Sequence, residues 1–126
     1  MNINQDRVLV VDDDLDSRCI FEEQLSRLGY STVTAKDGED AIDILTQDPY
    51  FDLIITDVMM PYMTGFDFTT SLRKHAATKN IPIIATSAFH DWKKAREDHE
   101  LIADGFVPKP VERDVLEREI KKVMKK

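Results

Sequence analysis

Three short, mostly apolar segments of this chain each end directly before charged residues. The charged residues are Asp12, Asp13 and Asp14 after the first segment, Asp57 after the second and Lys109 after the third. If the segments are neighbouring parallel strands, the charged groups meet in one crevice at the carboxyl ends of the strands, where open α/β sheets bind ligands. Carboxylates that lie together resist ionising together unless a cation joins them. The pattern therefore predicts a metal site or a proton-sharing site suited to phosphoryl chemistry.

Apolar runs alternate with segments of helical periodicity along the whole chain. The expected strands are Val8–Val11, Ser31–Ala35, Leu53–Thr56, Ile81–Thr86 and Phe106–Val107. The expected helices, whose apolar residues recur at helical spacing, are Leu15–Leu28, Glu39–Gln47, Phe66–His75, Ala88–Ala103 and Glu112–Met124. Five strand–helix units in strict alternation predict a parallel sheet with helices on both faces and right-handed crossovers.

Length and charge limit the classes of protein that fit. The 126 residues suffice for one domain with a real core and are too few for two, so we expect a single domain over residues 1–126 with its core at 7–124. The net charge of −7 argues against general binding to nucleic acid or anionic membranes. No apolar stretch reaches the ~20 residues of a membrane helix, and the N-terminus lacks an apolar signal region. We therefore expect a cytoplasmic protein that binds neither membrane nor nucleic acid directly.

The cysteine and the histidines are not expected to do chemistry. Cys19 is the only cysteine, which excludes an internal disulfide, and we expect it to pack on its helix as a small hydrophobe. His75, His90 and His99 lack the spacing of paired metal ligands.

Four motifs together resemble the receiver domain of two-component response regulators, in particular the single-domain chemotaxis regulators. The motifs are V-L-V-V-D-D-D from Val8, L-I-I-T-D-V-M-M-P-Y-M-T-G from Leu53, P-I-I-A-T-S-A from Pro82 and G-F-V-P-K-P from Gly105. They occur in the order and with the spacing of the family, and the resemblance spans about Arg7 to Met124. It implies a flavodoxin-like (βα)5 three-layer sandwich whose parallel five-stranded sheet has the order 2-1-3-4-5.

The resemblance implies a phosphoacceptor and a magnesium site. Asp57 matches the aspartate whose carboxylate attacks a phosphoryl group donated by a phosphohistidine. Asp13, Asp57 and the backbone carbonyl of Met59 would hold Mg²⁺, and Asp12 would act mainly through a metal-bound water. Such a hard cation keeps several waters and neutralises charge on the transferring phosphoryl group. Asp14 is expected instead in the first turn of the next helix, near its positive end.

Further residues match the parts of the family that respond to phosphorylation. Lys109 would pair with a carboxylate before phosphorylation and with a phosphoryl oxygen afterwards, and a cis Lys109–Pro110 bond is implied. Ser87 matches the hydroxyl that bonds the phosphoryl group, whereas Thr86 would point to the other side of the strand. Phe106 matches the aromatic switch, whose ring changes rotamer; a core ring that never switches is the alternative.

Two apolar residues depart from the polar types that could promote hydrolysis of the aspartyl phosphate. By resemblance, Met59 and Phe89 flank the water that attacks this phosphate. Apolar side chains hinder that water and position it poorly. We therefore expect the phosphoryl group to persist longer than it would beside polar residues.

The implied function is a phosphorylation switch in two-component signalling. Its partners would be a sensor histidine kinase or phosphotransfer protein, and an unidentified output protein that binds the fourth helix, fifth strand and fifth helix. The domain would catalyse its own phosphorylation and slow dephosphorylation without being a turnover enzyme. A monomer and a phosphorylation-dependent dimer both fit, and whether the receiver stands alone or belongs to a longer protein stays open.

Three other functions compete with this interpretation. A protein-docking module with the receiver fold but no phosphorylation predicts damage to the acidic set, and the sequence shows none. An acid phosphatase-type hydrolase with Asp57 as nucleophile usually has another acid two residues on, where this chain has Met59. A flavin-binding protein needs a Ser/Thr/Gly-rich phosphate loop after the first strand, where this chain has three aspartates.

Overall fold

The computed structural model describes residues 6–58, 65–88 and 103–124. Its five-stranded sheet has the order β2-β1-β3-β4-β5, and every neighbouring pair is parallel. The strands are β1 Arg7–Val11, β2 Ser31–Ala35, β3 Leu53–Asp57, β4 Ile83–Ala88 and β5 Gly105–Lys109. The helices are α1 Leu15–Arg27, α2 Gly38–Gln47, α3 Gly65–Lys74 and α5 Arg113–Met124. The predicted flavodoxin-like order 2-1-3-4-5 is confirmed.

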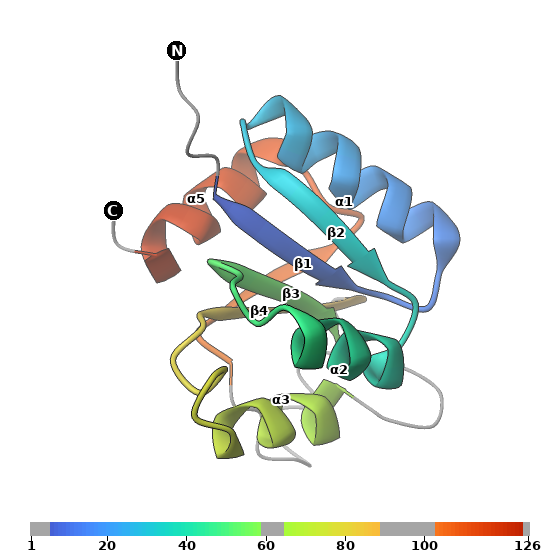
Figure 1. Ribbon diagram of the computed structural model, residues 1–126. Coiled ribbons are helices and arrows are strands. Elements are labelled where there is room, and N and C mark those ends of the chain that lie inside the picture. Colours follow the sequence, from blue (N-terminus) through green and yellow to red (C-terminus); the bar gives the residue numbers. More distant parts are fainter. Residues whose placement is uncertain (1–5, 59–64, 89–102, 125–126) are drawn as a thin grey trace.

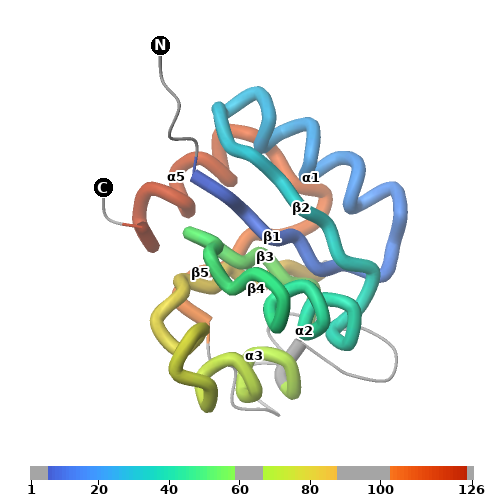
Figure 2. The backbone as a smooth tube through the Cα atoms, viewed as in Figure 1, coloured from blue at the N-terminus to red at the C-terminus, as the bar shows by residue number. Residues whose placement is uncertain are grey.

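Helices cover both faces of the sheet (Figure 1). On β1, Val8 and Val10 pack in the cluster that includes residues of α1 and α5, whereas Leu9 and Val11 pack in the cluster that includes residues of α2 and α3. Successive residues of a strand face opposite ways, so a strand covered on both sides must be apolar throughout. This is why β1 after Arg7 and β3 before Thr56 are continuous apolar runs. Figure 2 shows β2 beside β1 at one edge of the sheet, and the strand order places β5 at the other edge.

Local signals fix the ends of the first two helices. Asp14 is the N-cap of α1 and accepts a hydrogen bond from the backbone N–H of Ser17 at 3.2 Å. Asp37 caps α2 in the same way through the N–H of Asp40 at 2.8 Å. After α1, Gly29 has a φ of 93°, a left-handed conformation that glycine adopts without steric cost.

The fourth strand is shifted by two residues from its predicted position of Ile81–Thr86. The backbone N–H of Ile81 donates to Thr78 O at 3.1 Å in a turn, and Pro82 has no N–H to donate. The ladder therefore starts at Ile83, and it continues through Ser87 and Ala88, which pair with Pro108 and Lys109. Ala88, expected to start the fourth helix, ends this strand instead, and 89–102 of that helix lie outside the described residues.

The expected packing of Cys19 is wrong, because the side chain is exposed on α1. The buried residues of this helix are Phe21 and Leu25, four positions apart and thus on one face. Cys19 lies two positions before Phe21, and two steps of about 100° carry it to the opposite side of the helix. Ile20 is also 44% exposed.

Candidate functional site

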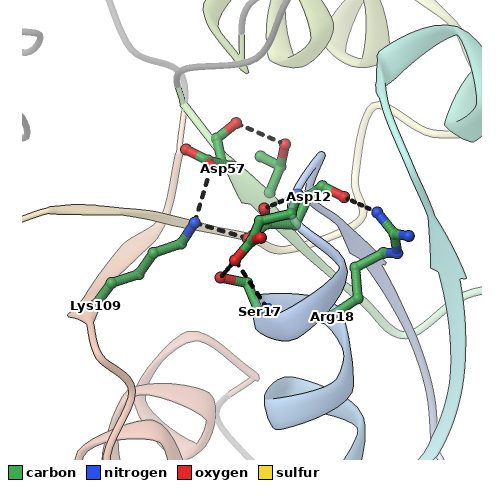
Figure 3. A network of polar contacts seen from close by, with 7 residues as sticks. Asp12, Ser17, Arg18, Asp57 and Lys109 are labelled. Carbon is green, nitrogen blue, oxygen red and sulfur yellow. Dashed lines mark hydrogen bonds and ion pairs between the residues drawn. The ribbon is translucent and has the colours of Figure 1, made fainter.

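The strand register brings the predicted charged residues to the carboxyl edge of the sheet. Asp12 follows the last residue of β1, and Asp57 is the last residue of β3. Because Val11 of β1 pairs with Thr56 of β3, the two aspartates leave neighbouring strands at the same level. Lys109 ends β5 and reaches across to both of them (Figure 3).

Asp12, Asp13 and Asp57 form one cluster, called here the acidic triad. One carboxylate oxygen from each lies within 4.8 Å of the other two. Asp12 is 0% exposed and Asp57 is 6% exposed, whereas Asp13 is exposed to solvent. The structure thus brings together the three carboxylates that the sequence assigns to one site.

Lys109 joins the two buried carboxylates of the triad. Its Nζ lies 2.9 Å from Asp57 Oδ2 and 2.8 Å from Asp12 Oδ2. Burial alone would lower the pKa of Lys109, but the hydrogen bonds and charges of Asp12 and Asp57 outweigh it and raise the pKa above its usual value. The ammonium therefore stays charged and offsets part of the repulsion between the carboxylates. The expected cis Lys109–Pro110 bond is present.

One buried oxygen of the triad is left with an incomplete set of partners. Asp12 Oδ1 accepts a hydrogen bond from the N–H of Asp14 at 3.0 Å. Asp12 Oδ2 has the ammonium of Lys109, at 2.8 Å, as its single partner among the described residues. A buried carboxylate oxygen without full compensation is costly. An all-oxygen set of three carboxylates with such an atom fits a hard cation such as Mg²⁺.

Backbone contacts hold the loop that bears Asp12. The N–H of Asp12 donates to Ala35 O of β2 at 3.1 Å. Its carbonyl accepts a hydrogen bond from Arg18 Nη1 of α1 at 2.7 Å (Figure 3). Asp14 lies outside the triad as expected, and its Oδ2 accepts from Ser17 Oγ at 3.0 Å. The sequence analysis missed Arg18, although side chains of a helix point toward its N-terminus and so toward this loop.

The two hydroxyl candidates are neighbours on β4. Thr86 pairs with Asp57 in the ladder, and Ser87 is the next residue toward the carboxyl edge. Both are buried, at 1% and 3% exposure. Thr86 Oγ1 has no hydrogen-bond partner among the described residues. Adjacent strand residues face opposite sides of a sheet, so only one of the two can serve the site, and Ser87 remains the prediction.

Phe106 lies on the edge strand β5 and is half-buried. Its ring packs against the small cluster of Val58 and Ala85, which links β3 and β4 beside the site. The N–H of Phe106 donates to Glu119 Oε2 of α5 at 2.9 Å. Whether the ring changes rotamer remains a prediction. Met59 and Phe89 lie outside the described residues.

Comparison with known proteins defines the class of the chain. A family model for the response regulator receiver domain matches residues 8–121. The chain belongs to this family and is a receiver domain of two-component response regulators. Within the described ranges, no helix has the length and apolar character needed to cross a bilayer.

Particular relatives agree with this assignment. The chain is 40% identical over 126 residues to a protein of Cyanophora paradoxa named "Probable transcriptional regulator ycf27"; this match covers 100% of the chain and 51% of that protein. The chain thus spans about half the length of this relative.

Solved structures show the same fold. The chemotaxis response regulator CheY4 of Vibrio cholerae has a TM-score of 0.84 and 33% identity, covering 95% of this chain and 99% of that one. The receiver domain of a sensor histidine kinase from Pseudomonas aeruginosa has a TM-score of 0.87 and 25% identity, covering 98% of this chain and 100% of that one. That structure has a magnesium ion coordinated in its active site cleft.

Proposed function

We propose that the chain is a phosphorylation switch in which Asp57 accepts a phosphoryl group at a magnesium site. The observation that supports this most directly is the acidic triad with Lys109 bound to two of its members, at 2.8 and 2.9 Å. A structural ion pair needs one carboxylate for one ammonium. Here Lys109 pairs with two carboxylates, and a third has an oxygen within 4.8 Å of theirs, which leaves negative charge that a divalent cation can satisfy.

The proposed reaction forms a bond between an oxygen of Asp57 and phosphorus. The phosphorus–nitrogen bond of a phosphohistidine breaks, and the histidine leaves with the electron pair. Asp57 is held in place at the end of β3 and is 6% exposed, so positioning supplies much of the effect. Asp12, Asp13 and Asp57 would hold Mg²⁺, with Met59 O as a further predicted ligand. The bound ion would neutralise charge on the transferring phosphoryl group.

Lys109 and Ser87 would respond to the change of charge at Asp57 by forming new bonds. Phosphorylation replaces a carboxylate by a group with more negative charge and three strong acceptor oxygens. The ammonium of Lys109 would then bond a phosphoryl oxygen, and the hydroxyl of Ser87 would donate to another. Phe106 would follow Ser87 by a change of rotamer, stabilised by packing alone because its ring has no hydroxyl. These contacts bias an existing equilibrium between two states.

The proposed partners follow from this chemistry. A sensor histidine kinase or phosphotransfer protein supplies the phosphohistidine. An output protein binds the face made by the fourth helix, β5 and α5. The receiver itself acts as a monomer or forms a phosphorylation-dependent dimer. Asp57 is both the nucleophile and the carrier of the product, so we propose a signalling protein that modifies itself rather than a turnover enzyme.

We also propose that residues 1–126 contain one receiver domain with its core at 7–124. Support comes from the two large hydrophobic clusters, each of which includes residues of β1 together with residues from later strands and helices. An interior shared in this way by distant segments favours folding as one unit.

The test of the proposed reaction is the intact mass after incubation with acetyl phosphate and Mg²⁺. We expect the wild type to gain one phosphoryl group and Asp57→Asn to gain none, because the amide is not a nucleophile of this kind. Asp43→Asn, which makes the same charge change at an exposed position of α2, is the matched control and should react like the wild type. A wild type that stays unmodified, also with a phosphorylated histidine donor, would favour the phosphorylation-independent docking module.

The lifetime of the phosphorylated state gives a separate prediction. The double substitution Met59→Asn with Phe89→Glu should speed dephosphorylation, because polar side chains can bind and orient the attacking water. The decay of the phosphorylated mass after removal of the donor measures this. An unchanged decay rate would show that these two positions do not control the lifetime.

A further inference from the structure

Arg18 contacts the peptide that joins two members of the acidic triad. It lies in the second turn of α1 and donates Nη1–H to the backbone carbonyl of Asp12 at 2.7 Å (Figure 3). That carbonyl shares its peptide plane with the N–H of Asp13. The guanidinium therefore restrains the orientation of the link between Asp12 and Asp13.

Asp13 depends on its backbone for its position. The Asp12 side chain is held at both oxygens, by the N–H of Asp14 and by Lys109. Asp13 is exposed, and within the described ranges its carboxylate has no hydrogen bond or ion pair to another residue. The orientation of the peptide before it therefore helps to set the direction of its side chain relative to the other two members of the triad.

Within the described part of the chain, Arg18 is the one side chain that bonds this carbonyl, and it forms no ion pair with a carboxylate there. Its positive charge near the triad opposes the binding of a cation. If Arg18 acted through its charge alone, its position beside the triad would weaken metal binding. The hydrogen bond to the Asp12 carbonyl and the charge thus have opposite effects on metal affinity, and an experiment can separate them.

We propose that Arg18 is a positioning residue of the metal site, which fixes the Asp12–Asp13 peptide so that the oxygens of the triad meet the geometry that Mg²⁺ demands. This inference rests on the proposed function, since it takes the acidic triad as the magnesium site. Mg²⁺ requires near-ideal octahedral coordination, whereas Ca²⁺ accepts variable geometry and more ligands. Loss of Arg18 should therefore weaken the binding of Mg²⁺ more than that of Ca²⁺.

The experiment is calorimetric titration of Arg18→Met and wild type with Mg²⁺ and, separately, with Ca²⁺. We expect the Kd for Mg²⁺ to rise about tenfold, the lower end of the effect of removing partners that orient metal ligands. The Kd for Ca²⁺ should change clearly less. Arg27→Met is the matched control, because it removes the same charge from the same helix at a side chain that is 60% exposed and pairs with Glu23. Both of its Kd values should stay at the wild-type level.

The possible outcomes separate this inference from the proposed function. Tighter or unchanged Mg²⁺ binding by Arg18→Met would mean that the charge dominates and would overturn the inference. Equal weakening for both cations would indicate a general loosening of the loop and would also overturn it. If Arg18→Met does not fold, Arg18→Lys takes its place, because it keeps the charge but loses the planar donor. Its Kd for Mg²⁺ should likewise rise more than its Kd for Ca²⁺. A wild type that binds neither cation would instead remove the proposed metal site itself.

Discussion

Lys109→Met should lower the free energy of unfolding by about 2–3 kcal/mol in the absence of divalent cations, less than the ~3–5 kcal/mol lost when a fully buried pair is broken. The substitution leaves Asp12 and Asp57, which are 0% and 6% exposed, without their shared cation. The reduction is smaller than for a fully buried pair because the Lys109 side chain is itself 23% exposed. Urea unfolding with a chelator measures the change.

Added Mg²⁺ should restore a large part of this loss, because a divalent cation can take the place of the ammonium between the carboxylates. Binding to the folded state alone stabilises it in proportion to the logarithm of the ligand concentration over Kd. Lys121→Met is the matched control: its side chain is 73% exposed, it pairs with Glu117 at 3.4 Å, and such surface pairs contribute about 0–1 kcal/mol. A stability of Lys109→Met that does not rise with added Mg²⁺ would show that the triad does not hold the ion.

The same variant has a defined pH dependence. The pKa of Lys109 is raised in the folded protein above its usual 10.5. Its ion pairs therefore contribute fully to stability below that value, and the contribution is lost as the pH rises through the folded-state pKa. The difference in unfolding free energy between wild type and Lys109→Met should shrink above pH 10.5. Comparing the two proteins cancels the titration of the other lysines and tyrosines.

The strands that bear the site were predictable because of how they are buried. A continuous apolar run that ends on a carboxylate indicates a central parallel strand with its polar end in the ligand crevice. Val8–Val11 and Leu53–Thr56 have this pattern, and both strands extend it by one residue, to Arg7 and to Asp57. Residue types and the resemblance then placed Asp12, Asp57 and Lys109 together.

Other features depend on contacts that a linear pattern does not contain. The boundaries of β4 follow from a turn at Ile81, the missing N–H of Pro82 and the capping of the Ile83 N–H by Asp104 Oδ2 at 2.9 Å. The exposure of Cys19 follows from the rotation of α1 about its axis, which Phe21 and Leu25 decide. Arg18 donates to the backbone carbonyl of residue 12. Every residue type has this carbonyl, so the sequence gives no sign of the bond.

Arg73 joins three segments at the opposite end of the sheet from the site. From the last turn of α3, Nη1 donates to Lys79 O at 2.9 Å and Ile81 O at 2.8 Å, and Nη2 pairs with Asp104 Oδ2 at 2.9 Å. The same Asp104 oxygen accepts the N–H of Ile83, the first residue of β4. The guanidinium thus ties the end of α3 to the start of β4 and to the residue before β5. The sequence did not indicate this pair, whose members are 31 residues apart.

Arg73→Met should therefore lower the free energy of unfolding by about 2–3 kcal/mol, because two carbonyls and one carboxylate lose a charged donor. The side chain is only 19% exposed, so water replaces these bonds incompletely. Since the network lies at the amino ends of β4 and β5, the Mg²⁺ affinity of the folded variant should match the wild type. Urea unfolding and cation titration together test this, with Arg27→Met as the control for charge. A stability within about 0.5 kcal/mol of wild type, as for ordinary surface substitutions, would mean that solvent satisfies the three acceptors. A weaker Mg²⁺ affinity would instead show that this network and the acidic triad are coupled along β4 and β5.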